Sequence, residues 1–338
     1  MSDVFWLNLT TGCEYFGLAM SILGNSMLLG CLLKRPNEGI GSYKYLMITF
    51  SIFSLFYTAV ETFLRPLLHH YDNTLFVIQR KRFDYSTTVA RAISSIYCGC
   101  FAMSFVLFAL HFLYRYFAAC KPDNLRHFQG KKFLYWVFGA ILISLTWSAC
   151  AFFCYPHTSR TDSSLRYVLA TSYGLEFNSV DYVPYNYYVY PNNGTEKQLN
   201  MLNMIGVIHH VTVMQISLGI VQNYGIKTYS TICAFKGTST RTKRLQKQLF
   251  HALVIQTLIP LICMFLPNTI LMVASFVDFI EFGAYANICV VMAHIYPGID
   301  PFVTLFLIKD FRRYIKSIIF RTELSVGNST VTQSVAKK

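Results

Sequence analysis

Seven long apolar stretches, separated by shorter polar segments, run along this chain of 338 residues. Each has room for the roughly 20 apolar residues with which an α-helix crosses the hydrocarbon core of a bilayer. The pattern therefore predicts an all-α membrane protein, a seven-transmembrane helix bundle over 12–308. We place its helices at 12–33, 45–66, 90–114, 133–155, 202–224, 249–276 and 285–308.

Basic residues gather on one side of these stretches. The segments after the first, third, fifth and seventh stretches hold 21 of the 29 Lys and Arg residues, and only four acids oppose them. Short cytoplasmic segments of membrane proteins carry such an excess of Lys and Arg. We therefore expect residues 1–11 outside the cell and the C-terminus in the cytoplasm.

The net charge of +13 has the same origin. The predicted cytoplasmic segments carry +17 and the rest of the chain −4. The excess is thus a signal of topology and a contact surface for lipid headgroups or a cytoplasmic partner. Nucleic acid is excluded as a partner, because no soluble fold with a basic groove is available.

The predicted outer segments carry two glycosylation sequons, at Asn8 and Asn193. A third, at Asn328, lies in the predicted cytoplasmic tail and is expected to stay unmodified. The first ten residues hold an acid and no basic residue, so no cleavable signal peptide is expected and the first helix would act as its own signal-anchor.

The ten cysteines do not form the pattern of a disulfide framework, since most lie inside apolar stretches, where they behave as small hydrophobic residues. The long outer segment 156–200 contains none. A bridge between the third and fourth helices is one possibility that spacing does not decide. It would use Cys98 or Cys100 with Cys150 or Cys154.

The segment 156–200 is also notable for DYVPYNYYVY at 181–190, which has five tyrosines in ten residues. Its alternating aromatic and β-branched residues predict a short strand or hairpin. Two interpretations of this part are open. One is a tyrosine-rich segment at the level of the lipid headgroups, and the other is a lid over an outward-facing cavity.

After the seventh stretch, residues 309–320 place Phe311 and Ile315 at helical spacing among Arg312, Arg313 and Lys316. This predicts a short amphipathic helix on the inner leaflet. The polar residues 321–338 predict a disordered tail.

His111 and Arg115 lie inside or at the edge of the third stretch, and an ionisable residue in a spanning helix is a hypothesis of function by default. Their spacing of four puts them on one helix face. Arg115 either extends to the headgroups or takes part in a switch. His111 either hydrogen-bonds a neighbouring helix or belongs to the same switch.

Asp300 lies in the sequence YPGIDPF of the seventh stretch, between Pro297 and Pro301. A carboxylate at this depth needs a partner or a proton. The cluster is either a static packing element or a movable joint, because each proline interrupts the helix ladder. The expected polar partners of Asp300 are Asn25, Thr49, Ser51 and Ser54.

The sixth stretch holds a second bendable element at Pro260 and Pro267. The residues before it, 240–250, contain four basic residues and no acid. This charge is accounted for by topology and lipid contact, and it also suits docking of a cytoplasmic partner.

Several blocks of this sequence, in order, resemble the nematode seven-transmembrane chemoreceptors of the Str class, the serpentine receptors. The resemblance covers nearly the whole chain, from the first helix to the short helix after the seventh. The blocks are GSYKYLM at 41–47, RKRFDYST at 80–87, HFLYRYFAACKP at 111–122, RLQKQLFHALVIQTLIP at 244–260, and YPGIDPF at 296–302 followed by IKDFRR at 308–313.

The resemblance implies a G-protein-coupled olfactory receptor in the cilium membrane of chemosensory neurons, acting in chemotaxis. Its ligand would be a small volatile odorant, a diacetyl-like ketone or a related small polar organic molecule. Its partner would be a heterotrimeric G protein. Neither a cofactor nor a metal site is expected.

The layout is more distantly similar to rhodopsin-like receptors. Arg115 matches the arginine of their acidic-Arg-aromatic motif, and Asp300-Pro301 stands in place of their Asn-Pro. Tyr114 replaces the acid of the motif, so the usual ionic restraint on Arg115 is absent. The second stretch has no aspartate, and Asp300 would supply that acid instead. The activation mechanism of that class therefore transfers only in outline.

These considerations assign three sets of candidate residues, with the ligand expected among helices 3, 5, 6 and 7. The ligand-binding candidates are Ser94, Tyr97, Met103, Ser104, His209, Asn268 and His294. The switch candidates are His111, Arg115, Pro267, Asp300 and Pro301. The candidate contacts with the G protein are Arg115, Tyr116, Lys243, Arg244 and Lys247.

Three other classes of function fit less well. A seven-helix odorant-gated ion channel would have its N-terminus inside, which the distribution of basic residues opposes. A transporter would show an internal repeat, and none is evident. A membrane metalloenzyme would need clustered histidines, and the pairs His69-His70 and His209-His210 lack the repeated spacing of such sites.

Overall fold

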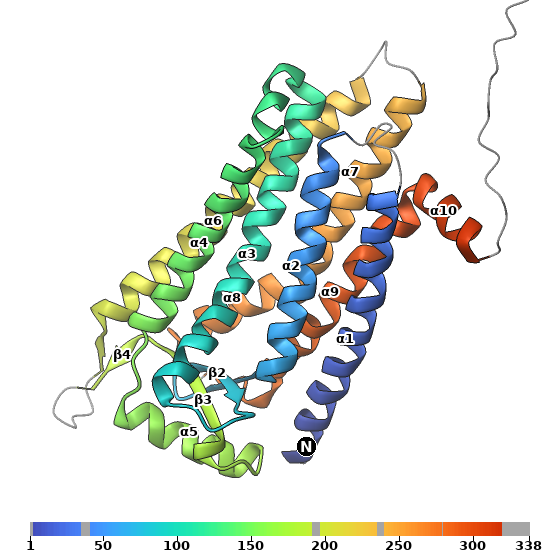
Figure 1. Ribbon diagram of the computed structural model, residues 1–338. Helices are drawn as coiled ribbons and strands as arrows, with labels where there is room; N and C mark the ends of the chain where they lie inside the picture. Colours follow the sequence, from blue (N-terminus) through green and yellow to red (C-terminus); the bar gives the residue numbers. More distant parts are fainter. Residues whose placement is uncertain (1–2, 35–40, 191–196, 235–239, 279, 320–338) are drawn as a thin grey trace, which may run out of the picture.

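The computed structural model describes residues 3–34, 41–190, 197–234, 240–278 and 280–319. Over these residues the chain crosses the molecule seven times, which confirms the predicted helix bundle (Figure 1). The crossings are α1 (Asp3–Lys34), α2 (Tyr43–Leu64), α3 (Thr87–Cys120), α4 (Lys132–Phe153), α6 (Met201–Ala234), the segmented helix α7–η4–α8, and α9 (Asn287–Leu307). Six of these helices, among the described residues, are each long and apolar enough to span a membrane.

The two ends of the bundle differ. A small sheet and helix α5 (Ser159–Ser172) cover the end at which the chain begins, here called the sheet end (Figure 1). The opposite end, here called the basic end, carries the connections expected in the cytoplasm. It holds the short helix η1 (Pro122–Phe128) and α10 (Lys309–Ile319), in which Phe311 is buried and Arg312 and Arg313 are exposed.

Several helices extend beyond the apolar stretches. Residues 3–11, expected as part of an extracellular segment, form the start of α1, and Trp6 packs edge-on against Tyr285 with ring centroids 5.7 Å apart. Helices α3 and α6 also continue past the expected ends at 114 and 224. The reason is that backbone hydrogen bonds do not stop at the hydrocarbon boundary, whereas hydropathy registers only the apolar part.

The sixth crossing is divided in three: α7 (Thr240–Pro260), a π-helical turn η4 (Leu261–Phe265) and α8 (Leu266–Ala274). The amide of Leu266 donates to the carbonyl of Leu261, five residues earlier, and Pro267 has no amide to continue the α-helical ladder. The irregularity thus lies between the two prolines singled out in the sequence.

Helices α1 and α9 approach closely because glycines line their contact. A Cβ atom on Gly298 would lie 2.7 Å from Met20 Cβ, and one on Gly24 would lie 2.6 Å from Pro301 Cγ. Small residues permit such approach in membrane helices, where packing rather than the hydrophobic effect holds helices together. Pro301 is therefore seated against α1.

The sheet is antiparallel, with the order β1 (Leu67–Tyr71), β2 (Thr74–Arg80) and β3 (Val180–Asn186). Asp72 and Asn73 join β1 to β2 with φ values of 49° and 54°. Two residues at positive φ are the signature of a type I′ hairpin turn, and Asp and Asn tolerate that conformation.

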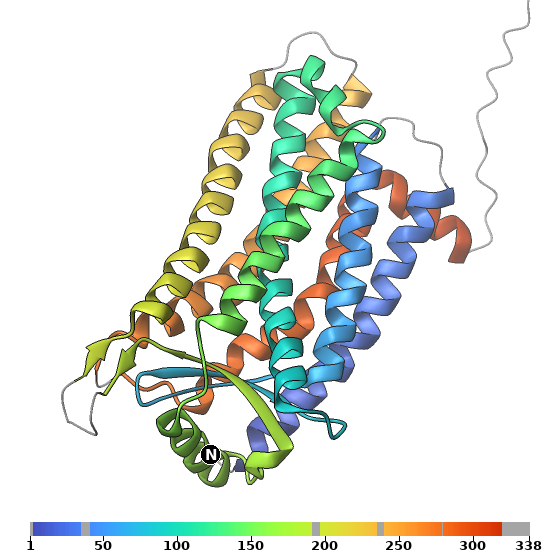
Figure 2. The same cartoon turned by 60° about the vertical axis from the view of Figure 1, so that its left-hand side comes forward.

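The two faces of the sheet pack on different layers. Phe76 and Ile78 face Leu165 and Leu169 of α5, whereas Leu75 and Val77 join the core of the bundle. Strand residues point alternately to opposite faces, so one hairpin serves both layers. Figure 2 shows the sheet between α5 and the ends of the helices.

All seven residues of β3, which begins the tyrosine-rich segment, are buried between α5 and the bundle, so over 180–186 the segment packs within the protein and does not face lipid. A two-stranded ribbon of β4 (Tyr188–Val189) and β5 (Gln198–Leu199), and the short 3₁₀ helices η2 (Phe177–Ser179) and η5 (Ala284–Ala286), complete the described elements.

Ion pairs of one buried carboxylate connect the sheet end to the bundle. The Glu14 carboxylate of α1 is fully buried and lies 3.6 Å from Arg65, which follows α2. It also lies 3.8 Å from both Arg80 and Arg82 of the hairpin region. One acid thus joins three parts of the chain.

Candidate functional site

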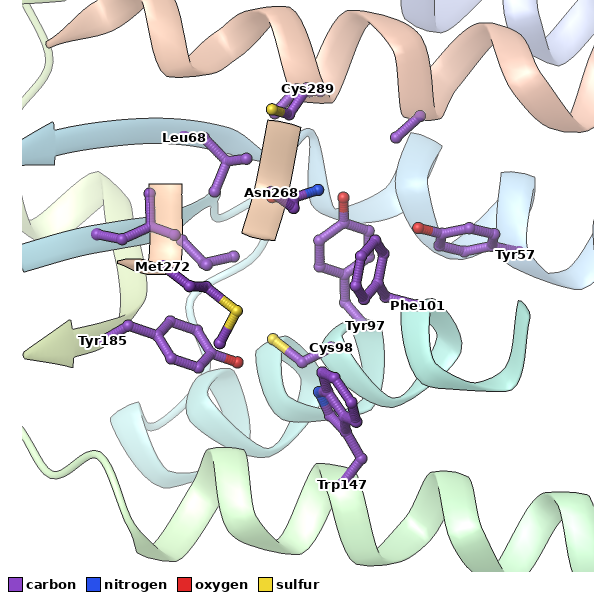
Figure 3. Close-up of a pocket in the computed structure, with 14 residues that line it drawn as sticks. Tyr57, Leu68, Tyr97, Cys98, Phe101, Trp147, Tyr185, Asn268, Met272 and Cys289 are labelled. Carbon is purple, nitrogen blue, oxygen red and sulfur yellow. The ribbon is translucent and has the colours of Figure 1, made fainter. Parts of the chain in front are cut away.

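A small cavity lies where the bundle meets the sheet (Figure 3). Its volume of about 60 Å³ is several times the 10–15 Å³ that one water needs, so it has room for roughly four to six non-hydrogen atoms. It is lined by Tyr57, Leu68, Leu75, Val77, Tyr97, Cys98, Phe101, Trp147, Tyr185, Asn268, Met272, Cys289, Val290 and Ala293.

Helical spacing explains why these residues meet. Tyr97 and Phe101 are one turn apart on α3, and Asn268 and Met272 are one turn apart on α8, so each pair lies on one helix face. The sheet closes the cavity from outside with residues of its inner face, including Val77 and Tyr185.

Most of the lining is apolar, and a few polar atoms converge in it. Figure 3 shows the Asn268 amide and the Tyr97 hydroxyl pointing toward the same space, with the Tyr57 hydroxyl nearby. The Tyr185 hydroxyl points in from the opposite side, beside the Cys98 sulfur. An apolar cavity with a few placed donors is the usual form of a small-molecule site.

Aromatic residues connect the cavity to the irregular part of the sixth crossing. Phe101, which lines the cavity, packs edge-on against Phe265 of the π-helical turn, with centroids 5.5 Å apart. Phe265 also stacks on Phe105 at 3.7 Å. A displacement of Phe101 in the cavity wall is therefore passed by direct contact to Phe265, in the segment between Pro260 and Pro267.

A buried contact between an acid and a histidine lies beside the cavity. Glu61 of α2 and His294 of α9 are 3.6 Å apart and almost fully buried. Tyr57, one turn before Glu61, and Ala293, next to His294, both line the cavity. Glu61 is not among the candidates predicted from the sequence, although a carboxylate inside the second apolar stretch is itself a signal of function.

Toward the basic end, Tyr43 contacts both His111 and Arg115 of α3. Its hydroxyl is 2.9 Å from His111 Nδ1, and the Arg115 guanidinium lies 3.6 Å from the centre of its ring. The predicted common face of His111 and Arg115 is thus confirmed. Arg115 is only 2% exposed, so its interpretation as a side chain that extends to the headgroups is wrong.

Asp300 is buried and pairs with α7. Gln256 donates from Nε2 to Asp300 Oδ2 at 3.0 Å and to the Asp300 carbonyl at 3.1 Å. The predicted partners were wrong: Asn25 donates to the Pro297 carbonyl, and Thr49 donates to the carbonyl of Tyr45. Gln256 was visible in the sequence, but which helix faces Asp300 depends on the tertiary arrangement.

Comparison with known proteins gives the class of this bundle. The sequence model of a family described as "Serpentine type 7TM GPCR chemoreceptor Str" matches residues 10–316. The chain belongs to this family. It is a receptor of the serpentine type and a multi-pass membrane protein.

Individual relatives of this Str receptor match over nearly its whole length. The chain is 39% identical over 333 residues to "Serpentine receptor class r-10" of Caenorhabditis elegans, covering 98% of this chain and 97% of the relative. The Caenorhabditis briggsae protein of the same name is also 39% identical, over 334 residues. The C. elegans "G-protein coupled receptor str-33" is 25% identical over 323 residues.

Of the seven ligand-binding candidates in the Str receptor, Tyr97 and Asn268 line the cavity. The other five lie elsewhere. Ser94 is buried, the Met103 sulfur accepts a hydrogen bond from Ser144, Ser104 donates to the Cys100 carbonyl, His209 contacts Thr146, and His294 faces Glu61. These five candidates were misplaced because the spacing of residues shows which of them share a helix face. It does not show which part of the protein that face contacts.

The candidate contacts with a G protein are partly accessible. Arg244 and Lys247 are exposed at the basic end, whereas Arg115 is buried. Tyr116 packs on Tyr224 of α6 with ring centroids 4.7 Å apart. The side chain of Lys243 lies outside the described residues.

Of the glycosylation candidates, Asn8 is exposed on α1, and Asn193 lies outside the described residues. Cys98, Cys100, Cys150 and Cys154 are all free thiols, so the bridge left open by the sequence is not formed. Cys150 instead lies close to His209 and His210, an arrangement with the side-chain types of a metal site.

Proposed function

We propose that this Str receptor binds a small volatile odorant, a diacetyl-like ketone or a related small polar organic molecule, in the cavity beneath the sheet. The observation that carries the proposal is the size and chemistry of that cavity. About four to six non-hydrogen atoms fill it, and the Asn268 amide and Tyr97 hydroxyl face its space. Both groups donate hydrogen bonds, which a ketone oxygen accepts.

The size of the cavity also limits affinity. The best small ligands gain about 1.5 kcal/mol per non-hydrogen atom, so six atoms give at most about 9 kcal/mol. That corresponds to a Kd of the order of a micromolar or weaker. We expect responses to volatile compounds at micromolar concentrations, and a larger ligand would require the sheet to move.

A ligand screen tests the proposal in cells that express the full chain, with a calcium or second-messenger readout. For a responding ketone, Tyr97→Phe and Asn268→Leu should each raise the half-maximal concentration about tenfold, the value of one hydrogen bond. The matched controls are Tyr135→Phe and Asn223→Leu, whose side chains are exposed on α4 and α6. Unchanged responses in both cavity variants at equal surface expression would place the ligand elsewhere.

We propose that the basic end activates a heterotrimeric G protein when the ligand is bound. The exposed cations Arg244 and Lys247 at the start of the sixth crossing support this, because a helix that moves there would present them to an acidic partner. The double variant Arg244→Glu, Lys247→Glu should lose ligand-stimulated nucleotide exchange. Arg166→Glu, at the sheet end, is the control and should retain it.

The alternative is an odorant-gated ion channel. It predicts a ligand-evoked current in membranes without G protein and an N-terminal tag that intact cells hide. The receptor proposal predicts no such current and a tag that antibodies reach from outside. Residence in the cilium and a role in chemotaxis belong to the same proposal, and a tagged chain in chemosensory neurons tests them by its position and by the behaviour of animals that lack it.

A further inference from the structure

Three side chains from two helices converge near the sheet end, beside the cavity. The sulfur of Cys150 on α4 and one ring nitrogen each of His209 and His210 on α6 all lie within 4.8 Å of one another. A thiol and two imidazoles are ligands of soft and borderline metal ions. The sequence pattern does not reveal this group, since its third member lies on a different helix.

The hydrogen bonds around the two histidines leave the same nitrogen of each ring available. The Thr146 hydroxyl donates to the carbonyl of Ile143 at 2.7 Å, so it accepts from His209 Nε2 at 3.1 Å. His210 Nε2 faces the carbonyl of Trp147 at 3.4 Å. A carbonyl only accepts, so both rings carry their proton on Nε2 and keep a lone pair on Nδ1.

Both Nδ1 atoms are buried, and neither has a hydrogen-bond partner among the described residues. His210 is completely buried, so its ring is removed from bulk solvent. An unpartnered buried acceptor is costly, and a cation held by this group through the two Nδ1 atoms would satisfy both of them. Partners on the outer nitrogen of each ring are also what metal-binding histidines commonly have.

We propose that Cys150, His209 and His210 form a three-coordinate copper(I) site. Charge selects the metal. Copper(I) with one thiolate and two neutral imidazoles is a neutral complex, whereas zinc(II) with the same ligands keeps one positive charge, which is costly within a bilayer. Coordination number points the same way, because zinc(II) would need a fourth ligand such as water, whereas copper(I) is satisfied by the three side chains.

The geometry requires only a small adjustment. Three donors around one ion, at the 2.0–2.3 Å usual for nitrogen and sulfur, lie about 3.7 Å from one another. The present group, within 4.8 Å, closes to that spacing if each side chain moves by about an ångström. On binding, the Cys150 thiol loses its proton to solvent and a sulfur–copper bond forms, with no change in oxidation state.

The position of the site lets copper(I) enter it and brings the bound ion close to the cavity. Cys150 is three residues from the end of α4, which is about 5 Å along the helix, and both Cys150 and His209 are only half-buried. Copper(I) therefore reaches the site from the headgroup level. His210 stacks on Trp147 with ring centroids 4.0 Å apart, and Trp147 lines the cavity, so bound copper rests directly behind the cavity wall.

Copper(I) binding to the purified full chain tests the proposal under anaerobic, reducing conditions, against a colorimetric copper(I) chelator. We expect one copper(I) per receptor. Cys150→Ser and His209→Gln should each lower the affinity at least tenfold. Thr146→Val should also lower it about tenfold, because loss of an outer hydrogen bond to a ligand histidine typically costs that much. Thr146 is exposed on α4, so this variant folds without rearrangement.

Matched controls are Cys233→Ser and His251→Gln, two exposed residues at the other end of the bundle. Both should bind copper as the unmodified chain does. X-ray absorption should show one sulfur and two nitrogen ligands. Equal binding in the Cys150→Ser, His209→Gln double variant, sulfur-only coordination, or a preference for zinc(II) would each overturn the proposal. No odorant enters these measurements, so they stand or fall independently of the proposed ligand.

Discussion

Phe105 of α3 and Phe265 of the π-helical turn stack face to face, with ring centroids 3.7 Å apart and ring planes 27° apart. The pair joins α3, which lines the cavity with Tyr97, Cys98 and Phe101, to the π-helical turn of the sixth crossing. Helices move at such irregularities more easily than in regular turns. This contact is therefore where a ligand would bias the position of the sixth crossing.

Phe265→Ala should uncouple the cavity from the basic end. The buried ring is worth about 3–5 kcal/mol in packing, so we expect a lower melting temperature and a ligand-evoked signal reduced by at least tenfold at equal surface expression. Phe306→Ala is the control, because that ring is 65% exposed on α9. If Phe265→Ala signals normally, the stacked pair does not transmit the response.

Tyr43→Phe separates the contact of Tyr43 with His111 from its contact with Arg115, in the cluster that these three residues form. It removes the 2.9 Å hydrogen bond to His111 but keeps the ring beneath Arg115. The expected cost is about 1 kcal/mol of stability, together with altered basal signalling if the cluster is a switch. His111→Phe and Arg115→Gln should alter signalling in the same assay. Normal signalling in both would rule out their role as a switch.

Glu14→Gln should loosen the attachment of the sheet to the bundle. The substitution removes the one buried acid that faces Arg65, Arg80 and Arg82, and leaves partly buried cations that repel one another. We expect a melting temperature several degrees lower and faster proteolysis at 65–86. Glu176→Gln, at an exposed position of the same end, should behave as the unmodified chain.

Acidification should destabilise the sheet end through His69. Burial, with His70 beside it, lowers the pKa of His69 from 6.5 to about 4. The pKa of His69 is lower in the folded chain than in the unfolded chain. Between pH 6.5 and 4 the unfolded chain therefore binds a proton at His69 that the folded chain does not bind. Stability is therefore complete above pH 6.5 and falls as the pH drops toward 4.

At pH 5 this loss amounts to about 2 kcal/mol. His69→Gln keeps a polar group near the Tyr173 hydroxyl, which is 3.1 Å from His69 Nδ1, and does not titrate. Melting temperatures at pH 7.5 and pH 5 should therefore differ less for the variant than for the unmodified chain. An equal difference in the two proteins would show that other groups set the acid sensitivity.

The arrangement of Asp300 shows where prediction from the sequence reaches its limit. Its depth and its need for a partner follow from the apolar residues around it. The identity of that partner does not, because Asn25 and Gln256 lie on different helices and both are polar at a suitable depth. Gln256 is the partner of Asp300 because α7 and α9 pack with these two residues facing each other.

The hairpin is a different kind of omission. Its signal was present as Asp72-Asn73 between two apolar runs, the composition of a two-residue turn. What the sequence alone does not show is that β3, about 100 residues later, completes the sheet and closes the cavity. Pairing between distant strands depends on both faces being covered, here by α5 and by the bundle.

The sequence by itself determined the seven crossings, the side on which basic residues gather, the family, and the common face of His111 and Arg115. These follow from local periodicity and from the energy of placing charge in a bilayer, which act on each segment separately. The tertiary structure alone decided which polar residues meet. The cavity with Tyr97 and Asn268, the Glu61–His294 contact and the Cys150, His209 and His210 group depend on how helices rotate and pack, and packing is a property of facing surfaces rather than of any one stretch.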